Sequence, residues 1–160
     1  MTFDDLLPPV TDLASDFDKA ISPWHWLVRD SASPLLITAL GDVFMEIVTS
    51  VYFLDTLSGS ISRVAESRAK WKEELQNPER INEWFLPEFV EALKEGGQRL
   101  KSGEVFSPTI PLVLGGSMSV ENFTPSQWRM HLHVLGQIHK QVRRLAPGTR
   151  IDNIKIEPLP

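Results

Sequence analysis

The spacing of apolar residues near the start of the chain predicts an amphipathic helix from Thr11 to Ile21. The apolar face of this helix is formed by Leu13, Phe17, Ala20 and Ile21. The acidic residues that should point away from that face are Asp12, Asp16 and Asp18. The dipeptide Ser22-Pro23 then ends the helix, because a residue that precedes proline disfavours helical backbone angles.

After Pro34 the pattern changes to short runs that are rich in β-branched and aromatic residues. These runs predict four strands, which are Leu35–Ala39, Val43–Val48, Val51–Asp55 and Ser60–Ala65. The turns between them fall at Gly41-Asp42, Thr49-Ser50 and Ser58-Gly59. Such short connections favour an antiparallel meander, because parallel strands need a long crossover.

Helical spacing returns in the middle of the chain and predicts helices over Glu66–Gln76 and Pro87–Glu95. In the second of these, Pro87 suits the first helical position. Gly96-Gly97 supplies its end, since glycine adopts the left-handed conformation at little steric cost.

The last third of the chain predicts a strand, a helix and a final strand. Apolar residues alternate with Arg129, His131 and His133 between Trp128 and Val134, which indicates a strand. The period becomes helical near Gly136, at positions Leu135, Ile138, Val142 and Leu145. Pro147-Gly148 ends this helix, and the final strand is suggested by Ile151, Ile154 and Ile156.

These elements predict a single α+β domain over residues 1–160, with an antiparallel meander and flanking helices. Residues 1–34 form an acidic N-terminal helix and linker in this interpretation. The length of 160 residues supports it, because one domain of this size can bury a substantial core.

Composition limits the possible partners and chemistry. The chain contains no cysteine, which excludes disulfides, thiolate metal sites and cysteine nucleophiles. Residues 1–60 contain nine acidic residues against Lys19 and Arg29, a net charge of −7, whereas the whole chain carries −5. Such a surface favours a basic protein as partner over nucleic acid. No signal peptide or membrane-spanning run is evident, so we expect a cytoplasmic protein.

The strongest catalytic candidate is the set His131, His133 and His139, because two histidines at i and i+2 on a strand share a face and can share a metal ion. Few acids lie nearby as further ligands, and a polar strand face explains the same pattern. Gly115-Gly116 lacks the lysine and spacing of a phosphate-binding loop and fits a tight turn. The sequence therefore predicts no enzyme, no cofactor and no metal.

Two features are candidates for binding a protein partner. Trp24 and Trp26 lie close together and fit an aromatic contact surface, although one ring in the core and one over a corner is the simpler interpretation. Asp12, Asp16 and Asp18 fit an acidic contact surface, and equally an ordinary solvated helix face.

Four stretches in order resemble a known family. They are VYFLDTLSG at Val51–Gly59, PLVLGGSMSVENF at Pro111–Phe123, GQIHKQV at Gly136–Val142 and APGTRI at Ala146–Ile151. They are similar to the C-terminal domain of bacterial type VI secretion immunity proteins that protect against DNase effectors and are usually encoded beside the toxin. The resemblance spans residues 35–157. Members commonly carry a longer upstream domain of the kind called GAD-like, whereas fifty residues precede Val51 here.

The resemblance implies an immunity protein that binds and neutralises a cognate nuclease toxin. We expect the toxin to be met by Asp12, Asp16, Asp18, Trp24 and Trp26, because a nuclease exposes a basic cleft for its substrate. The alternatives are a metal-dependent hydrolase that uses the three histidines and a structural or adaptor module of a secretion system.

Overall fold

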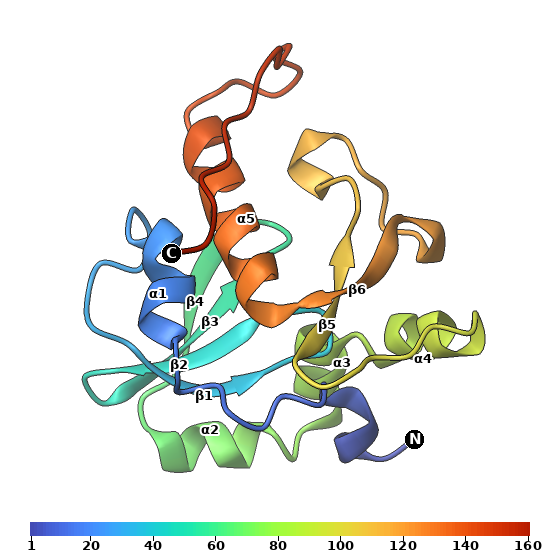
Figure 1. The fold of residues 1–160 in the computed structure, drawn as a ribbon. Helices are drawn as coiled ribbons and strands as arrows, with labels where there is room; N and C mark the ends of the chain where they lie inside the picture. The colour runs from blue at the N-terminus through green and yellow to red at the C-terminus, as the bar shows by residue number, and fades with distance from the viewer.

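The computed structural model describes residues 1–160 and is built on a four-stranded antiparallel sheet (Figure 1). The strands follow one another in the sheet in chain order, which confirms the predicted meander. Their bounds are β1 Ser33–Ile37, β2 Val43–Ile47, β3 Ser50–Asp55 and β4 Ser60–Ala65. The β4 strand pairs with β3 from Ser60 to Ala65, with one register shift between Val51 and Tyr52.

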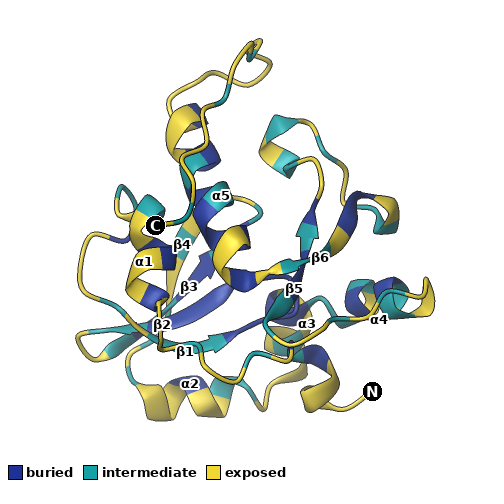
Figure 2. Ribbon diagram, in the orientation of Figure 1, coloured by how far each residue is buried: buried dark blue, intermediate teal, exposed yellow.

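Alternation along the central strands sends side chains to two different cores. Val43 lies opposite Leu54, and both belong to a core beneath α1 (Phe17–Ile21) and α5 (Trp128–Val142). Phe44 lies opposite Phe53 on the other face of the sheet. The two central strands are therefore buried from both sides, and Figure 2 shows buried residues along β2 and β3 and on the inner face of α5.

The second face of the sheet is covered by α2 (Arg68–Glu74) and α3 (Pro78–Phe85). Phe44 is the centre of an aromatic cluster, with ring centroids 5.3 Å from Trp71 and 5.1 Å from Trp84. Such tilted and edge-to-face pairs stabilise by about 0.5–1.5 kcal/mol each beyond the area that they bury. The helix α3 was not predicted from the sequence; Pro78 begins it after an Asn77 cap.

A smaller sheet and a third core lie beside the meander. The two strands β5 (Glu104–Pro108) and β6 (Phe123–Gln127) pair antiparallel, and neither was predicted. Phe106 and Phe123 pack against the inner face of α4 (Pro87–Glu95), whose bounds match the prediction. The turn at Gly115-Gly116 between these strands is confirmed, since Gly115 has a φ of +97° and a side chain at Gly116 would overlap the carbonyl of Ile110.

Two predicted helices are shorter in the structure. The N-terminal helix begins only at Phe17, because Asp16 has a φ of +64°, a left-handed conformation that a helix cannot continue through. The α-helix ends at Ile21, before Ser22-Pro23, as predicted, and the chain makes one further 3₁₀ turn over Ser22–Trp24. The helix predicted over Glu66–Gln76 is observed as Arg68–Glu74.

The strand predicted from Trp128 to Val134 is wrong, because these residues form the first half of the continuous helix α5. The apolar residues also recur at helical intervals, and the stripe that faces the core is Trp128, Leu132, Leu135, Ile138 and Val142. Met130, which the strand interpretation placed among the core residues, is 42% exposed. The helical pattern runs through the apparent alternation, so no change of period occurs at Gly136.

The final strand predicted at Ile151, Ile154 and Ile156 does not form, and the C-terminal residues return beside α5 without regular secondary structure (Figure 1). Two glutamines hold this tail. The amide group of Gln141 both accepts from the backbone N–H of Lys155 and donates to its carbonyl, at 3.0 and 2.7 Å. Gln137, one turn earlier, contacts the backbone of Glu157 in the same way. The amide groups of Gln137 and Gln141 thus make the hydrogen bonds to the tail backbone that a neighbouring strand would otherwise make.

Replacing both glutamines by alanine is expected to release the tail. The amide protons of Lys155 and Glu157 would lose their acceptors, so their hydrogen exchange should become at least about tenfold faster, which corresponds to about 1.4 kcal/mol of local opening. Lys140→Ala on the exposed side of α5 is the control and should leave exchange unchanged. Unaltered exchange in the double variant would show that the tail is held by other contacts.

Candidate functional site

Two histidines of α5 pack closely against the hairpin turns of the meander. Gly41, between β1 and β2, has a φ of +85°, and a side chain there would overlap the ring of His131. Gly59, between β3 and β4, has a φ of +73°, and a side chain there would overlap the ring of His139. Glycine is therefore needed at both turns for two reasons, the backbone conformation and the close approach of an imidazole.

A chain of hydrogen bonds links these turns to α5 and β5. Thr56 donates from its backbone N–H and its hydroxyl to Oδ1 of Asp42, at 2.7 and 2.9 Å. The same hydroxyl lies 2.9 Å from Nε2 of His131, whose Nδ1 lies 2.8 Å from the hydroxyl of Ser107. Nε2 of His139 donates to the Thr56 carbonyl at 2.9 Å. We call Asp42, Thr56, Ser107, His131 and His139 the polar cluster.

Burial sets the charges in the polar cluster. Asp42 and His131 are only 4% and 2% exposed. Burial, together with the nearby carboxylate of Asp55, raises the pKa of Asp42 to about 8. Burial lowers the pKa of His131 to about 3 and also lowers the pKa of His139. Near pH 7 the cluster is therefore predominantly uncharged, as expected for polar groups that hold a core together.

The contact between Ser107 and His131 has the elements of a nucleophile and a base, but its electrostatics are unsuited to catalysis. A general base works best with a pKa near the operating pH, and a pKa of about 3 makes His131 a very weak proton acceptor. Asp42 contacts Thr56 and not the imidazole, so it cannot orient or stabilise a protonated ring as the acid of a triad does. The geometry favours a structural role.

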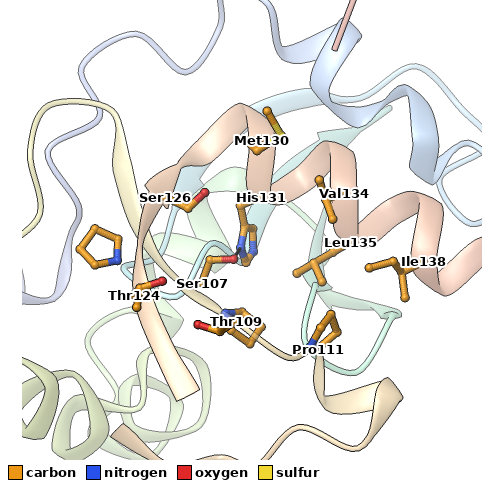
Figure 3. A pocket seen from close by; sticks show the side chains of 12 residues that line it. Ser107, Thr109, Pro111, Thr124, Ser126, Met130, His131, Val134, Leu135 and Ile138 are labelled. Atoms are coloured by element: carbon orange, nitrogen blue, oxygen red, sulfur yellow. Dashed lines mark hydrogen bonds between the residues drawn. The ribbon is translucent and has the colours of Figure 1, made fainter. Parts of the chain in front are cut away.

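Ser107 and His131 form the inner wall of a pocket of about 370 Å³ between β5, β6 and α5 (Figure 3). Pro111, Val134 and Ile138 provide apolar parts of its lining. In Figure 3 the hydroxyl of Ser107 points at the His131 ring. The pocket contains no charged side chain, so it offers little to attract a charged substrate.

The three histidines proposed as metal ligands do not meet. His131 and His139 contact different turns, and Nε2 of His133 donates to the carbonyl of Glu157 in the tail at 2.8 Å. The i, i+2 argument fails because the residues are helical, where such neighbours point about 200° apart around the axis. No group of three His, Asp or Glu side chains in the structure is arranged to hold a metal ion.

The acidic residues predicted to contact a partner are exposed, but they do not form a uniform acidic face. Arg129 of α5 lies 3.6 Å from Asp16, and it also helps to lower the pKa of Asp12, after the larger effect of hydrogen bonds from Ser15. Asp18 has no hydrogen-bond or ion-pair partner. Arg129 was not anticipated beside these acids because it lies more than one hundred residues away in the sequence.

The two tryptophans predicted as contact residues are placed differently. Trp24 is fully buried and donates from Nε1 to the Leu132 carbonyl at 2.8 Å, so it is a core residue with no surface to offer. Trp26 stacks on it with ring centroids 6.1 Å apart and is half-buried. The guanidinium of Arg143 lies 5.7 Å from the Trp26 ring. This arrangement matches the simpler interpretation of the pair.

The polar cluster itself was missed at the level of sequence. Asp42 and Thr56 are separated by 14 positions, and Thr56 and His131 by 75. The glycines at the turns were recognised, but only as turn formers. A buried acid beside a turn glycine gives no local signal that distinguishes it from an exposed turn residue.

Comparison with known proteins finds a family match over the middle of the chain. The model of the family described as "T6SS immunity protein Tdi1, C-terminal" matches residues 65–139. The crystal structure of Atu4351 from Agrobacterium tumefaciens is similar over 78% of this chain, at 19% sequence identity and with a TM-score of 0.48. The chain covers 62% of that protein. No curated protein matches.

No helix in the structure is long and apolar enough to cross a membrane. The matched residues run from the end of β4 to the last turn of α5 and include the PLVLGGSMSVENF stretch. The match confirms the resemblance for residues 65–139, which are similar to the C-terminal domain of type VI secretion immunity proteins.

Proposed function

We propose that this protein binds a secreted toxin encoded near its own gene and neutralises it in the cytoplasm of the cell that makes both. In this proposal the toxin is a nuclease, and it is inhibited for as long as this protein stays bound to it. The observation that carries the proposal is the family match over residues 65–139. An immunity protein needs tight, long-lived binding and no turnover, which agrees with a polar cluster that is neutral near pH 7 and has no effective general base.

The acidic character of the chain supports a nuclease as the partner. Enzymes that bind nucleic acid expose Lys and Arg to contact phosphates, and an acidic protein is attracted to the same surface. The net charge of −5 opposes direct binding of nucleic acid by this chain itself. The rival hydrolase is disfavoured by the separation of the three histidines.

Co-expression tests the proposal in cells. The toxin encoded beside the gene should arrest growth and degrade DNA when it is expressed alone, and both effects should disappear when this protein is expressed with it. A third expression with an immunity protein from an unrelated system is the control. Continued DNA degradation at matched expression levels would refute the proposal.

We further propose that the N-terminal acids steer the encounter with the toxin. Asp12 and Asp18 are exposed, and opposite charges accelerate association more than they slow dissociation. Reversal to Asp12→Lys and Asp18→Lys should lower the association rate about three- to tenfold at low salt, with the difference shrinking as salt screens the charges. Stopped-flow or surface plasmon resonance measures this rate. Identical rates at low salt would remove this segment from the encounter surface.

A further inference from the structure

A second pocket, of about 500 Å³, opens beside the turn between β3 and β4, and we call it the turn pocket. It is bordered by that turn, by α3 and by the 3₁₀ helix Leu112–Leu114. The residues that matter for its chemistry are Asp42, Asp55, Glu83, Trp84, Val113 and Met118. Two of the four stretches that resemble the immunity family, VYFLDTLSG and PLVLGGSMSVENF, meet at this pocket.

Asp42 gives the turn pocket a buried carboxyl group. Its Oδ1 is occupied by the two hydrogen bonds from Thr56, whereas Oδ2 has no hydrogen-bond partner in the protein. Oδ2 is not sealed from solvent, and Asp42 forms part of the pocket wall. A side chain that is 4% exposed therefore presents one free carboxyl oxygen to the pocket.

Asp55 adds a second carboxyl group at the same place. One of its oxygens accepts from the backbone N–H groups of Leu57 and Ser58, each at 3.0 Å, and the other has no partner. Asp55 lies close enough to Asp42 to disfavour a negative charge on it, which helps to raise the pKa of Asp42. No lysine or arginine lines the pocket to favour the ionised form of Asp42. A positive group entering the pocket would do so.

The rest of the pocket suits the stem of a long basic side chain. Val113 and Met118 are 40% and 42% exposed at its edge and provide an apolar wall. Glu83 stands at the edge as a third carboxylate and is paired with Arg80 of the same helix at 3.0 Å. Lysine and arginine bury their methylene stems against apolar surface while the charged end reaches polar groups.

We infer that the turn pocket is the place where the toxin is held, and that it receives a lysine or arginine side chain of the toxin between Asp42 and Asp55, with the stem against Val113 and Met118. This inference rests on the proposed function. A basic side chain fits better than a metal ion, because no three ligating groups converge here. It fits better than nucleic acid, because the carboxyl groups would repel phosphates.

The pocket acts at a different stage of binding from the N-terminal acids. A charge that becomes buried and paired in the complex must be exposed again on dissociation, so its loss appears in the dissociation rate. Asp42→Asn and Asp55→Asn are suitable changes, because an amide oxygen can still accept the hydrogen bonds from Thr56, Leu57 and Ser58. The changes remove the carboxylate of Asp55 and the negative charge that Asp42 would acquire beside a basic group, while the turn is kept.

The test is binding of the purified protein to a catalytically inactive form of the toxin encoded beside its gene, followed by surface plasmon resonance. The double variant Asp42→Asn with Asp55→Asn should dissociate at least about tenfold faster with little change in association rate. The control is Asp30→Asn with Glu66→Gln, which removes two exposed charges away from the pocket and should stay within about twofold of the wild type.

A second variant tests the site without touching the polar cluster. Val113→Lys places a basic side chain at the edge of the pocket, where its ammonium group can pair with the carboxyl groups in place of the toxin's side chain. This variant should also weaken toxin binding at least about tenfold. Wild-type binding with unchanged dissociation in both pocket variants would overturn this inference and leave the immunity function standing. Absence of binding by the wild type would instead refute the proposed function.

Discussion

Replacing Gly41 by alanine is expected to destabilise the protein by about 3 kcal/mol or more. The new methyl group would overlap the His131 ring, and the φ of +85° is unfavourable for any residue with a Cβ. The backbone conformation alone costs about 1–2 kcal/mol. Crowding in a packed core adds about 1–3 kcal/mol. Urea unfolding followed by tryptophan fluorescence and circular dichroism measures the loss in free energy of unfolding.

Gly97 supplies a matched control for this change. It has a φ of +91°, and a Cβ placed there would meet no atom within 4 Å, so Gly97→Ala isolates the backbone cost of about 1 kcal/mol. In a His131→Ala background, Gly41→Ala should cost no more than Gly97→Ala does. Equal costs for Gly41→Ala and Gly97→Ala in the wild-type background would show that His131 does not press against this turn.

The second large effect is a loss of stability between pH 6.5 and pH 8. In this range the folded protein keeps a proton on Asp42, whose pKa burial and Asp55 raise to about 8, whereas unfolded Asp42 is ionised. Because the folded state binds more protons, raising the pH favours unfolding by about 1.4 kcal/mol per pH unit, or about 2 kcal/mol over this range. The contribution is complete below the unfolded pKa of Asp42 and is lost as the pH rises through about 8.

His131 has the opposite effect at lower pH. Burial lowers its pKa from 6.5 to about 3, so between these values the unfolded chain binds the extra proton and stability rises with pH. The two groups nearly cancel from about pH 4 to 6.5, and Asp42 acts alone above this range. Asp42→Asn should therefore abolish the fall from pH 6.5 to 8 in urea unfolding, whereas Asp30→Asn should retain it. The same fall in Asp42→Asn would assign the titration to another group.

The parts of the fold that the sequence predicts well are those with local signals. The meander follows from short alternating runs and from turn residues such as Gly41 and Gly59, and α4 follows from Pro87 at its start and glycine at its end. In contrast, β5 and β6 contain Pro108 and Pro125 and little alternation. Their pairing depends on contacts across about twenty residues, which a local pattern does not contain.

The error at Trp128–Val134 has a physical explanation. A segment with apolar residues at both two- and four-residue intervals satisfies both periods, and only its continuation as far as Val142 favours the helix. The same error gave the histidines the wrong predicted positions. On a strand they would share a polar face, whereas on α5 His131 and His139 enter the core and contact Thr56. The candidate metal site depended on the wrong period.

Predictions of surface residues were limited because the sequence does not show which distant residues lie together in the fold. Trp24 and Trp26 are neighbours in sequence, yet one is in the core and the other is partly covered by Arg143. The acids of the N-terminal segment are partly offset by Arg129, whereas Asp42 and Asp55, which are thirteen positions apart, meet at one pocket. Local charge counts identified an acidic chain but not where its carboxyl groups converge.

The most direct test of the central claim is isothermal titration of this protein against the catalytically inactive toxin encoded beside its gene, with the toxin's nuclease assay run in parallel. We predict a 1:1 complex with a Kd of about 10⁻⁹ M or tighter and loss of nuclease activity at the same stoichiometry. The absence of binding at micromolar concentrations, or binding that leaves the nuclease fully active, would contradict the account.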